Sequence, residues 1–174
     1  MDKQNIKRFA QSLIIIPFLT TALPFGAVGQ GKVTDFVAMN IQEKVRFERA
    51  QVIDTYFKER KMPLEGLGEK FVFEAEKHGL DWRLLPAIAV RESSGGKKAC
   101  GSNPFGWASC RKVFKDFNQS IEIVALNLGG RNPKTASYYG ESDTYEKLYR
   151  YNGTVIKSYP SEVVAIMEKI GSYE

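Results

Sequence analysis

The chain has 174 residues, of which 26% are charged and 43% are hydrophobic, and its formal net charge is +5. This mild basic excess excludes the strongly basic footprint of a nucleic-acid-binding domain, although it suits an anionic matrix such as a bacterial wall. Once the N-terminal leader described next is set aside, about 145 residues remain, which is enough for one domain with its own hydrophobic core.

The N-terminus has the pattern of an export signal. Three basic residues precede an apolar run over residues 13–18, and small residues at positions 27 and 29 permit cleavage before Gln30. A retained membrane anchor is the alternative, but Pro17 and Pro24 disfavour a spanning helix. We therefore expect residues 1–29 to be a signal peptide. The processed protein would then lie in the periplasm, the cell wall or the medium, without a stable membrane span.

A long first helix is predicted ahead of the main body of the protein. Thr34 or Asp35 can cap this helix, which runs towards Arg60 and ends before Pro63. Its apolar stripe consists of Ile41, Val45, Val52 and Tyr56. We therefore divide the processed chain into a helical extension, residues 30–62, and a main domain that fills the rest, up to residue 174.

A second helix is predicted from about Leu64 to His78, with Gly79 as its left-handed stop. Its inward face would consist of Leu67, Phe71, Val72 and Ala75. His78 falls in the last turn, where a positive charge stabilises a helix end. Because no neighbour in the sequence would make it a base, we interpret His78 as structural.

The next helix carries the most informative residue of the chain, Glu92. Asp81 can cap this helix, and Pro86 is tolerated if it lies in the first turn. At a period of 3.6 residues, Glu92 shares a face with three apolar residues, namely Leu85, Ile88 and Ala89. A carboxylate on an apolar stripe at a helix C-terminus is disfavoured. Glu92 therefore either turns to water or serves as a catalytic acid.

A long loop over residues 95–116, here called the cysteine loop, follows Glu92. It holds the two cysteines of the chain, Cys100 and Cys110, which should form a disulfide in an exported protein. A metal site is the alternative, but it lacks ligands because the sole histidine, His78, lies in another segment. A loop of this length in a compact domain is usually functional or disordered, and the disulfide argues against disorder.

Three more helices are predicted after the cysteine loop. We expect them to begin near Asn118, at Ser142 or Asp143, and at Ser161, on the basis of caps and apolar stripes. Residues 153–159 could hold a short extended piece. The predicted fold class is therefore all-α (mainly α), in a single domain with at most a small β-hairpin.

Four stretches of the sequence resemble a known superfamily when they are taken in order. They are Phe71–Gly79 with Asp81–Leu85, Ala87–Gly96, Asn103–Trp107 and Tyr151–Gly153. Their order and spacing are similar to those of lysozyme-like enzymes, above all bacterial lytic transglycosylases and the endo-β-N-acetylglucosaminidase domains of autolysins. The resemblance covers residues 64–170 and implies a lysozyme-like domain. The Gly-Leu-Met-Gln stretch of many transglycosylases is absent, which leaves the product open.

The resemblance implies an enzyme that cuts β-1,4 bonds between N-acetylmuramic acid and N-acetylglucosamine in peptidoglycan. Glu92 would be the general acid that protonates the glycosidic oxygen. Tyr151 would hold either Glu92 or the N-acetyl group of the substrate through its hydroxyl. The residues expected to bind the glycan strand are Ser93, Ser94, Asn103, Phe105, Trp107 and Asn152.

Several of these residues also have a structural alternative. Phe105 or Trp107 could instead anchor the loop in the core, and Tyr151 could be a core tyrosine at a helix end. Ser93 and Ser94 could simply end their helix.

Hydrolysis normally requires a second carboxylate, for which Glu141, Asp143 and Glu146 are candidates. All three lie near a predicted helix start, however, where acidic residues commonly cap the helix. A lytic transglycosylase needs none, because the N-acetyl group of its substrate assists.

We expect no cofactor, no metal and no nucleic acid, and a monomer that binds peptidoglycan. The rival functions are a non-catalytic wall-binding or scaffold protein, and a secreted inhibitor that uses the cysteine loop as a partner surface.

Overall fold

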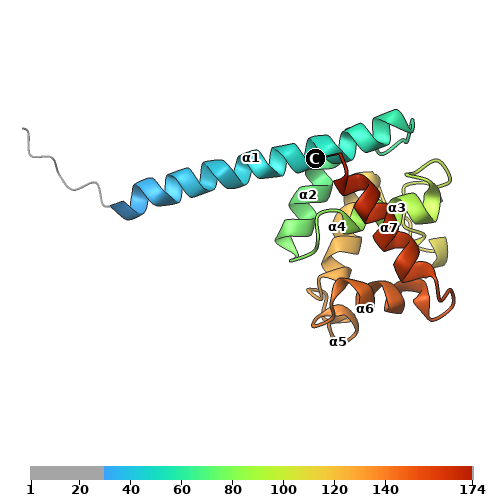
Figure 1. Cartoon of the computed structure of the whole chain (residues 1–174). Coiled ribbons are helices and arrows are strands. Elements are labelled where there is room, and N and C mark those ends of the chain that lie inside the picture. The colour runs from blue at the N-terminus through green and yellow to red at the C-terminus, as the bar shows by residue number, and fades with distance from the viewer. Residues whose placement is uncertain (1–29, 174) are drawn as a thin grey trace, which may run out of the picture.

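The computed structural model describes residues 30–173, with side chains from residue 40 onwards. The expected signal peptide and its cleavage site lie outside the described residues. This part of the chain forms seven α-helices and two shorter helical segments (Figure 1). They are α1 (Gln30–Glu59), α2 (Gly68–Lys77), α3 (Leu84–Ser93), η1 (Trp107–Cys110), α4 (Phe117–Leu128), α5 (Ala136–Tyr139), α6 (Thr144–Leu148), η2 (Tyr149–Gly153) and α7 (Tyr159–Gly171).

The prediction of an all-α domain is confirmed. Residues 30–173 contain no strand, and the single β-bridge among them lies within the cysteine loop. The extended piece expected over residues 153–159 is therefore wrong. Instead, η2 is a π-helical turn, and Gly153 at its end is buried between Tyr149 and Pro160. A Cβ at Gly153 would lie 2.9 Å from the Tyr149 ring, so this close packing requires glycine.

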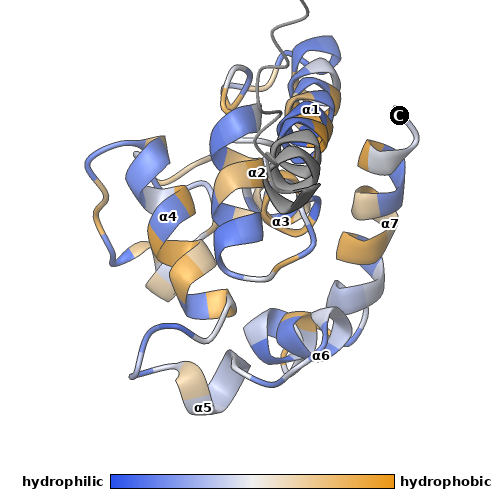
Figure 2. Cartoon of the chain, turned by 90° about the vertical axis from the view of Figure 1, so that its left-hand side faces the viewer, coloured by the Kyte–Doolittle hydropathy of each residue, from blue (hydrophilic) through white to orange (hydrophobic). Residues whose placement is uncertain are grey.

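Helices α2 to α7 form a bundle beside one end of α1, and the first half of α1 extends past it (Figure 1). The second half of α1 packs against α2 and α7, while α3 packs against α7 and α4 against α2. Apolar and hydrophilic residues alternate around α2, α4 and α7, as expected for helices with one buried face (Figure 2). Within residues 30–173, no helix combines the length and the apolarity that a membrane span requires.

The predicted stripe of α1 is only partly buried. Val52 and Tyr56 contact the bundle and are buried, but Ile41 is 59% exposed. The reason is that Ile41 belongs to the first half of α1, which extends past the bundle (Figure 1). The helix also begins at Gln30, earlier than the expected caps at Thr34 or Asp35.

Helix α2 begins at Gly68, four residues later than predicted, because the chain turns tightly after α1. The Asp54 carboxylate of α1 accepts hydrogen bonds from the backbone N–H groups of Gly66 and Gly68, at 2.8 and 2.9 Å. A Cβ at Gly68 would lie 2.2 Å from the Ala50 carbonyl oxygen. The start of α2 is therefore set by its contact with α1, which the local sequence pattern does not show.

Helix α3 follows the prediction except at its start, where Arg83 and not the expected Asp81 occupies the N-cap position. Pro86 lies in the first turn, and Leu85, Ile88 and Ala89 are fully buried. Ser94 ends the helix with a left-handed conformation, φ +54°. The residue on the same face at the end of the helix is Glu92, which is half-buried.

The later helix boundaries differ from the predictions by one or two residues. Asp116 caps α4, where we expected a start near Asn118, and its carboxylate accepts a bond of 2.8 Å from the Gln119 N–H. Asp143 caps α6, which is one of the two predicted positions. Helix α7 begins at Tyr159 rather than Ser161, because the proline that follows Tyr159 suits the first turn. The four-residue helix α5 is not predicted by the sequence.

His78 is the C-cap residue of α2 and lies in the interior of the domain. Its side chain is buried, the residue is only 7% exposed, and neither ring nitrogen has a hydrogen-bond partner in the described part of the chain. Burial lowers the pKa of His78, because the protonated ring would lose its hydration, and the Glu74 carboxylate 3.5 Å away opposes this only in part. At neutral pH the folded protein therefore holds His78 neutral, and the expected stabilisation of the helix end by a cation is absent.

The free energy of unfolding should consequently fall as the pH drops below 6.5. The folded-state pKa of His78 lies below its usual value of 6.5, so between these two values the unfolded chain binds the additional proton. The loss is at most about 1.4 kcal/mol per pH unit, the limit for one proton. Urea titrations at pH 7.5 and pH 5 would measure it, and His78→Phe should show a smaller loss over this interval. An equal loss in both proteins would contradict the prediction.

Candidate active site

A cleft of about 440 Å³ lies where the end of α3 meets the cysteine loop and η2. Glu92 is the one carboxylate in its lining. The remaining side of the cleft is contributed by α5, so four segments that are distant in sequence meet there. The lining residues are Glu92, Phe105, Gly106, Trp107, Ala108, Ser109, Tyr139, Tyr151 and Asn152.

The Glu92 carboxylate is held on one side and faces the loop on the other. Its Oε1 accepts a hydrogen bond of 2.7 Å from the hydroxyl of Tyr159, which is buried. Its Oε2 lies next to Gly106, where a Cβ would stand 3.3 Å from this oxygen. Gly106 has a φ of +60°, so the loop passes the carboxylate in a conformation that favours glycine.

Two stacked tyrosines, Tyr151 and Tyr159, hold the Glu92 carboxylate and the cysteine loop in place. The rings of Tyr151 and Tyr159 stack with centroids 5.9 Å apart and planes 8° from parallel. The Tyr151 hydroxyl donates a bond of 2.6 Å to the Phe105 carbonyl oxygen. Burial raises the pKa of both hydroxyls well above the usual value, and the Glu92 charge acts in the same direction. Both groups therefore keep their protons and remain hydrogen-bond donors.

The tyrosine that holds Glu92 is thus different from the one the sequence indicates. We expected Tyr151 to contact Glu92 or a substrate N-acetyl group, but its hydroxyl is bonded to the backbone of the cysteine loop. Tyr159, which the sequence analysis does not single out, donates to Glu92 instead. Tyr151 is still one of the residues that line the cleft.

An aromatic wall, consisting of Trp107, Tyr139 and Tyr151, forms one side of the cleft. The Trp107 ring lies 5.7 Å from the Tyr151 ring and 6.5 Å from the Tyr139 ring, measured between centroids. Tyr139 is buried, and burial raises its pKa to about 12. Trp107 is only half-buried, so part of the indole is available to a ligand. A rigid apolar surface of this kind can stack on a sugar ring.

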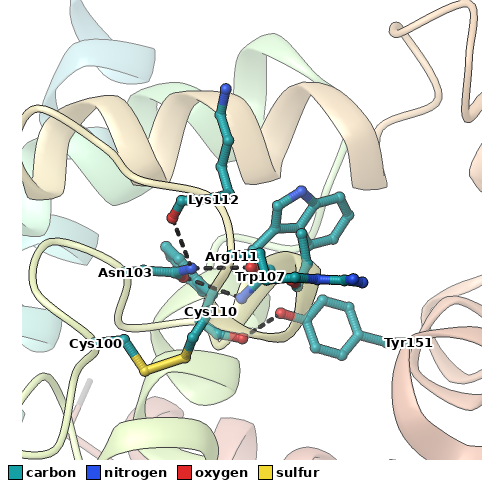
Figure 3. The surroundings of a disulfide bond; sticks show 9 residues. Cys100, Asn103, Trp107, Cys110, Arg111, Lys112 and Tyr151 are labelled. Carbon is teal, nitrogen blue, oxygen red and sulfur yellow. Dashed lines mark hydrogen bonds between the residues drawn. A yellow bond between two sulfur atoms is a disulfide. The ribbon is translucent and has the colours of Figure 1, made fainter.

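The cysteine loop is closed by a disulfide between Cys100 and Cys110, as predicted (Figure 3). Asn103 then organises the interior of the loop. Its amide nitrogen donates to the carbonyl oxygens of Trp107 and Lys112, at 2.9 and 3.3 Å, and its amide oxygen accepts from the Trp107 N–H at 3.0 Å. Because Asn103 is 1% exposed and fully bonded inside the loop, it positions Trp107 rather than contacting a substrate.

Three consecutive residues of the loop are left-handed although none is glycine. Ala108, Ser109 and Cys110 have φ values of +55°, +54° and +61°, and the first two line the cleft. Such a conformation costs on the order of 1 kcal/mol for each residue. The disulfide at Cys110 and the Asn103 bonds at Trp107 hold the two ends of this strained run.

Removing the disulfide should therefore lower stability. The double variant Cys100→Ser/Cys110→Ser is expected to lose about 2–3 kcal/mol of unfolding free energy, since the bond closes a short loop. Denaturant titration of both proteins, with and without a reducing agent, would measure this. The reductant should bring the native protein to the level of the variant and leave the variant unchanged. Native protein that is unaffected by reduction would contradict this expectation.

Ser93 and Ser94, which were expected to bind substrate, serve to end α3. The Ser93 hydroxyl donates to the Ala89 carbonyl oxygen at 3.0 Å and accepts from the Gly96 N–H at 3.0 Å, and the residue is buried. Ser94 supplies the left-handed cap. Neither residue is in the lining of the cleft. Phe105 is fully buried, in accordance with its alternative role as a loop anchor, while Asn152 lies in the lining.

The candidates for a second carboxylate lie outside the cleft. Glu141 and Asp143 line a separate depression beside His78. Asp143 caps α6, accepting from the Glu146 N–H at 2.7 Å, and Glu146 pairs with Arg150. In the described residues, the cleft therefore presents a single acid.

A second groove, of about 460 Å³, runs along α1 and ends at Tyr173. Its carboxylate, Glu48, has a side chain that is 59% exposed and is paired with Lys44. Glu48 thus lacks the support from buried donors that Glu92 has. For this reason the Glu92 cleft is the better candidate for chemistry.

The sequence does not indicate two residues that shape the cleft, namely Tyr139, which lines it, and Tyr159, which holds Glu92. Tyr159 precedes Pro160 at the start of α7, a position that gives a clear signal for a helix start but none for a contact with Glu92. Tyr139 lies on the short helix α5, which has no apolar periodicity to reveal it. Their proximity to Glu92 and Trp107 depends on the tertiary fold.

Comparisons with known proteins do not identify this chain. No family model, no curated protein and no solved structure matches it. Within the part of the chain that is described, no cluster of three or more His, Cys, Asp or Glu side chains could hold a metal ion. The structure thus shows an all-α domain with one acid in an aromatic cleft, and the lysozyme-like relationship stays a prediction.

Proposed function

We propose that this protein cuts β-1,4 bonds between N-acetylmuramic acid and N-acetylglucosamine in peptidoglycan, with Glu92 as the general acid. The observation that carries the proposal is the position of Glu92 in the cleft, with one carboxylate oxygen bonded to buried Tyr159. The disulfide is compatible with an exported protein. We place its action in the periplasm, the cell wall or the medium.

The geometry at Glu92 indicates which oxygen would carry the proton. Oε1 accepts from Tyr159, whose raised pKa keeps it a donor. Oε2 is the oxygen beside Gly106 and would therefore hold the proton that is transferred. As the bond to C1 breaks, the glycosidic oxygen takes this proton and leaves as a hydroxyl group.

The aromatic wall would orient the glycan strand. Trp107 offers part of its indole, and the rings of Tyr139 and Tyr151 support it from behind. Stacking of a sugar on this surface would place the adjacent glycosidic oxygen within reach of Glu92. Asn152, which also lines the cleft, can bond to hydroxyl or amide groups of the sugar.

The single acid of the cleft favours the mechanism of a lytic transglycosylase. In that mechanism, the carbonyl oxygen of the N-acetyl group attacks C1 as the leaving sugar departs. The 6-hydroxyl of the same sugar then attacks C1 and gives its proton to the Glu92 carboxylate. The C1–O bond to the N-acetyl group breaks, the N-acetyl group is restored and an anhydro ring closes. This route needs no second protein carboxylate, consistent with the distant positions of Glu141, Asp143 and Glu146.

Digestion of purified sacculi, followed by analysis of the soluble muropeptides, tests the proposal. Anhydro-muramyl ends are expected, while reducing N-acetylglucosamine or muramic ends would indicate a hydrolase with the same acid. The rival function, a non-catalytic wall-binding protein, predicts sedimentation with sacculi and no soluble fragments at any pH. That last result would overturn the proposal.

A further inference from the structure

The positive charge of the protein is concentrated in the cysteine loop. Residues 95–116 contain five lysine and arginine residues and one carboxylate, Asp116, which gives a net charge of +4. Residues 1–29 contribute +2 of the total of +5, so residues 30–174 together carry +3. Apart from the loop, the rest of residues 30–174 therefore has a net charge of −1.

Three of these basic residues form a cationic rim beside the cleft, namely Arg111, Lys112 and Lys115, and all three are exposed. Arg111 Nε donates to the carbonyl oxygen of Ala108 at 3.4 Å, and Ala108 lines the cleft. In Figure 3 the Arg111 side chain extends towards Trp107 and Tyr151, whereas Lys112 extends away from the disulfide. Through its bond to Ala108, Arg111 lies next to the part of the loop that lines the cleft.

The backbone of the cationic rim is fixed in this position. The Lys112 carbonyl oxygen is bonded to the same Asn103 amide that holds Trp107. The Lys115 N–H donates to the Gln119 side chain at 2.8 Å, at the start of α4. The rim therefore keeps a constant register relative to Trp107, while its charged side chains are exposed.

No carboxylate neutralises the cationic rim within the described residues. All the ion pairs there, at distances up to 4.0 Å, involve other cations. Asp116 is the adjacent acid in the sequence, but one of its oxygens accepts a bond from the Gln119 N–H as the cap of α4. Glu92 is the acid of the cleft and is bonded to Tyr159. The rim is thus available to an anionic ligand.

We propose that the cationic rim binds the carboxylates that a peptidoglycan strand carries beside its sugars, which rests on the proposed function of the cleft. A muramic sugar bears its lactyl group and peptide a few bonds from the ring that would stack on Trp107. Guanidinium and carboxylate groups match in a bidentate pair. A strand bound in the cleft would therefore bring its carboxylates to Arg111 first, and to the two lysines as it extends along the loop.

Binding can be measured separately from cleavage by using the Glu92→Gln protein throughout. Its sedimentation with purified sacculi is compared with that of Glu92→Gln carrying Arg111→Gln, Lys112→Gln and Lys115→Gln. Loss of the three charges is expected to weaken binding about ten-fold at low ionic strength and to make it less dependent on salt. A matched control replaces three exposed lysines outside the loop, Lys58, Lys134 and Lys169, by glutamine. This control should bind within about two-fold of the parent, because it changes net charge equally but leaves the rim intact.

Chemically altered sacculi identify the anion. Amidation of the wall carboxyl groups should abolish the advantage of the intact rim. In the intact wall the lactyl carboxyl group is amide-bonded to the stem peptide, so the carboxylates there belong to the peptide. An amidase that removes the stem peptides takes these carboxylates away and frees the lactyl carboxylate, so treated sacculi separate the two sources of this group. Equal binding by the rim variant and the lysine control would overturn the proposal. So would a rim effect that survives amidation but disappears when wall phosphate polymers are extracted.

The two proposals can fail independently. If the native protein releases no muropeptides, the proposed cleavage is lost, yet rim-dependent binding to carboxylate-bearing walls would still be observed with Glu92→Gln. If cleavage occurs but the rim variant binds like its control, only the inference about the rim is lost.

Discussion

Glu92→Gln is expected to reduce the release of muropeptides from sacculi by a factor of about 10²–10⁴, the usual contribution of a general acid. Glutamine has the same shape, and its amide oxygen can still accept the bond from Tyr159. What it lacks is the proton that the departing sugar oxygen must receive. The rate of fragment release, measured at equal protein concentration, gives the factor directly.

Two comparisons separate this effect from a loss of structure. The unfolding free energy of Glu92→Gln should stay within about 1 kcal/mol of the native value, since no apolar group is removed. Glu168→Gln, an exposed glutamate on α7, removes the same charge and should cleave at the native rate. If Glu92→Gln cleaves as fast as Glu168→Gln, Glu92 has no part in the chemistry.

Phe105→Ala should have the largest effect on stability, about 3–5 kcal/mol of unfolding free energy. Phe105 is fully buried in the hydrophobic core, and its truncation would leave a cavity beneath the cysteine loop. Its carbonyl oxygen also accepts from Tyr151, so a shift of the loop would disturb the stacked tyrosines. Urea denaturation measures the stability change, and cleavage at a temperature where the variant is folded measures the effect on the cleft.

Val113→Ala provides the matched control for Phe105→Ala. Val113 belongs to the same loop but is 86% exposed, so its truncation should change stability by no more than about 0.5 kcal/mol. A similar, small effect of both substitutions would show that Phe105 does not anchor the loop. A large effect of Phe105→Ala alone would confirm that the loop depends on this side chain for its attachment.

The parts of the structure that could be predicted are those whose information is local. The three apolar residues before Glu92 recur at the helical period, so α3 and the placement of Glu92 could be predicted from ten residues. The disulfide could be predicted from the two cysteines and the expectation that the chain is exported. His78 could be interpreted as structural, but its neutral state depends on burial between helices, which a helix pattern does not report.

The contacts that complete the cleft are not local and could not be predicted. Tyr159 and Glu92 are 67 residues apart, and Tyr151 and Phe105 are 46 residues apart. Ser93 looked like a ligand for substrate because it follows Glu92, yet the turn at the end of α3 directs its hydroxyl to the backbone. Gly153 likewise indicates a turn, but a glycine does not indicate which kind of turn precedes it. The π-helical turn η2 therefore could not be predicted, and we expected an extended segment after it.

The left-handed run from Ala108 to Cys110 has a consequence for recognition. A mobile loop must be ordered whenever a ligand arrives, and the entropy lost in doing so weakens association. Here the ordering is completed during folding and oxidation, when the covalent link and the Asn103 amide fix the run. A glycan strand that binds in the cleft would meet a surface that is already ordered. Because the disulfide maintains this order, the affinity of the protein for the strand would fall under reducing conditions.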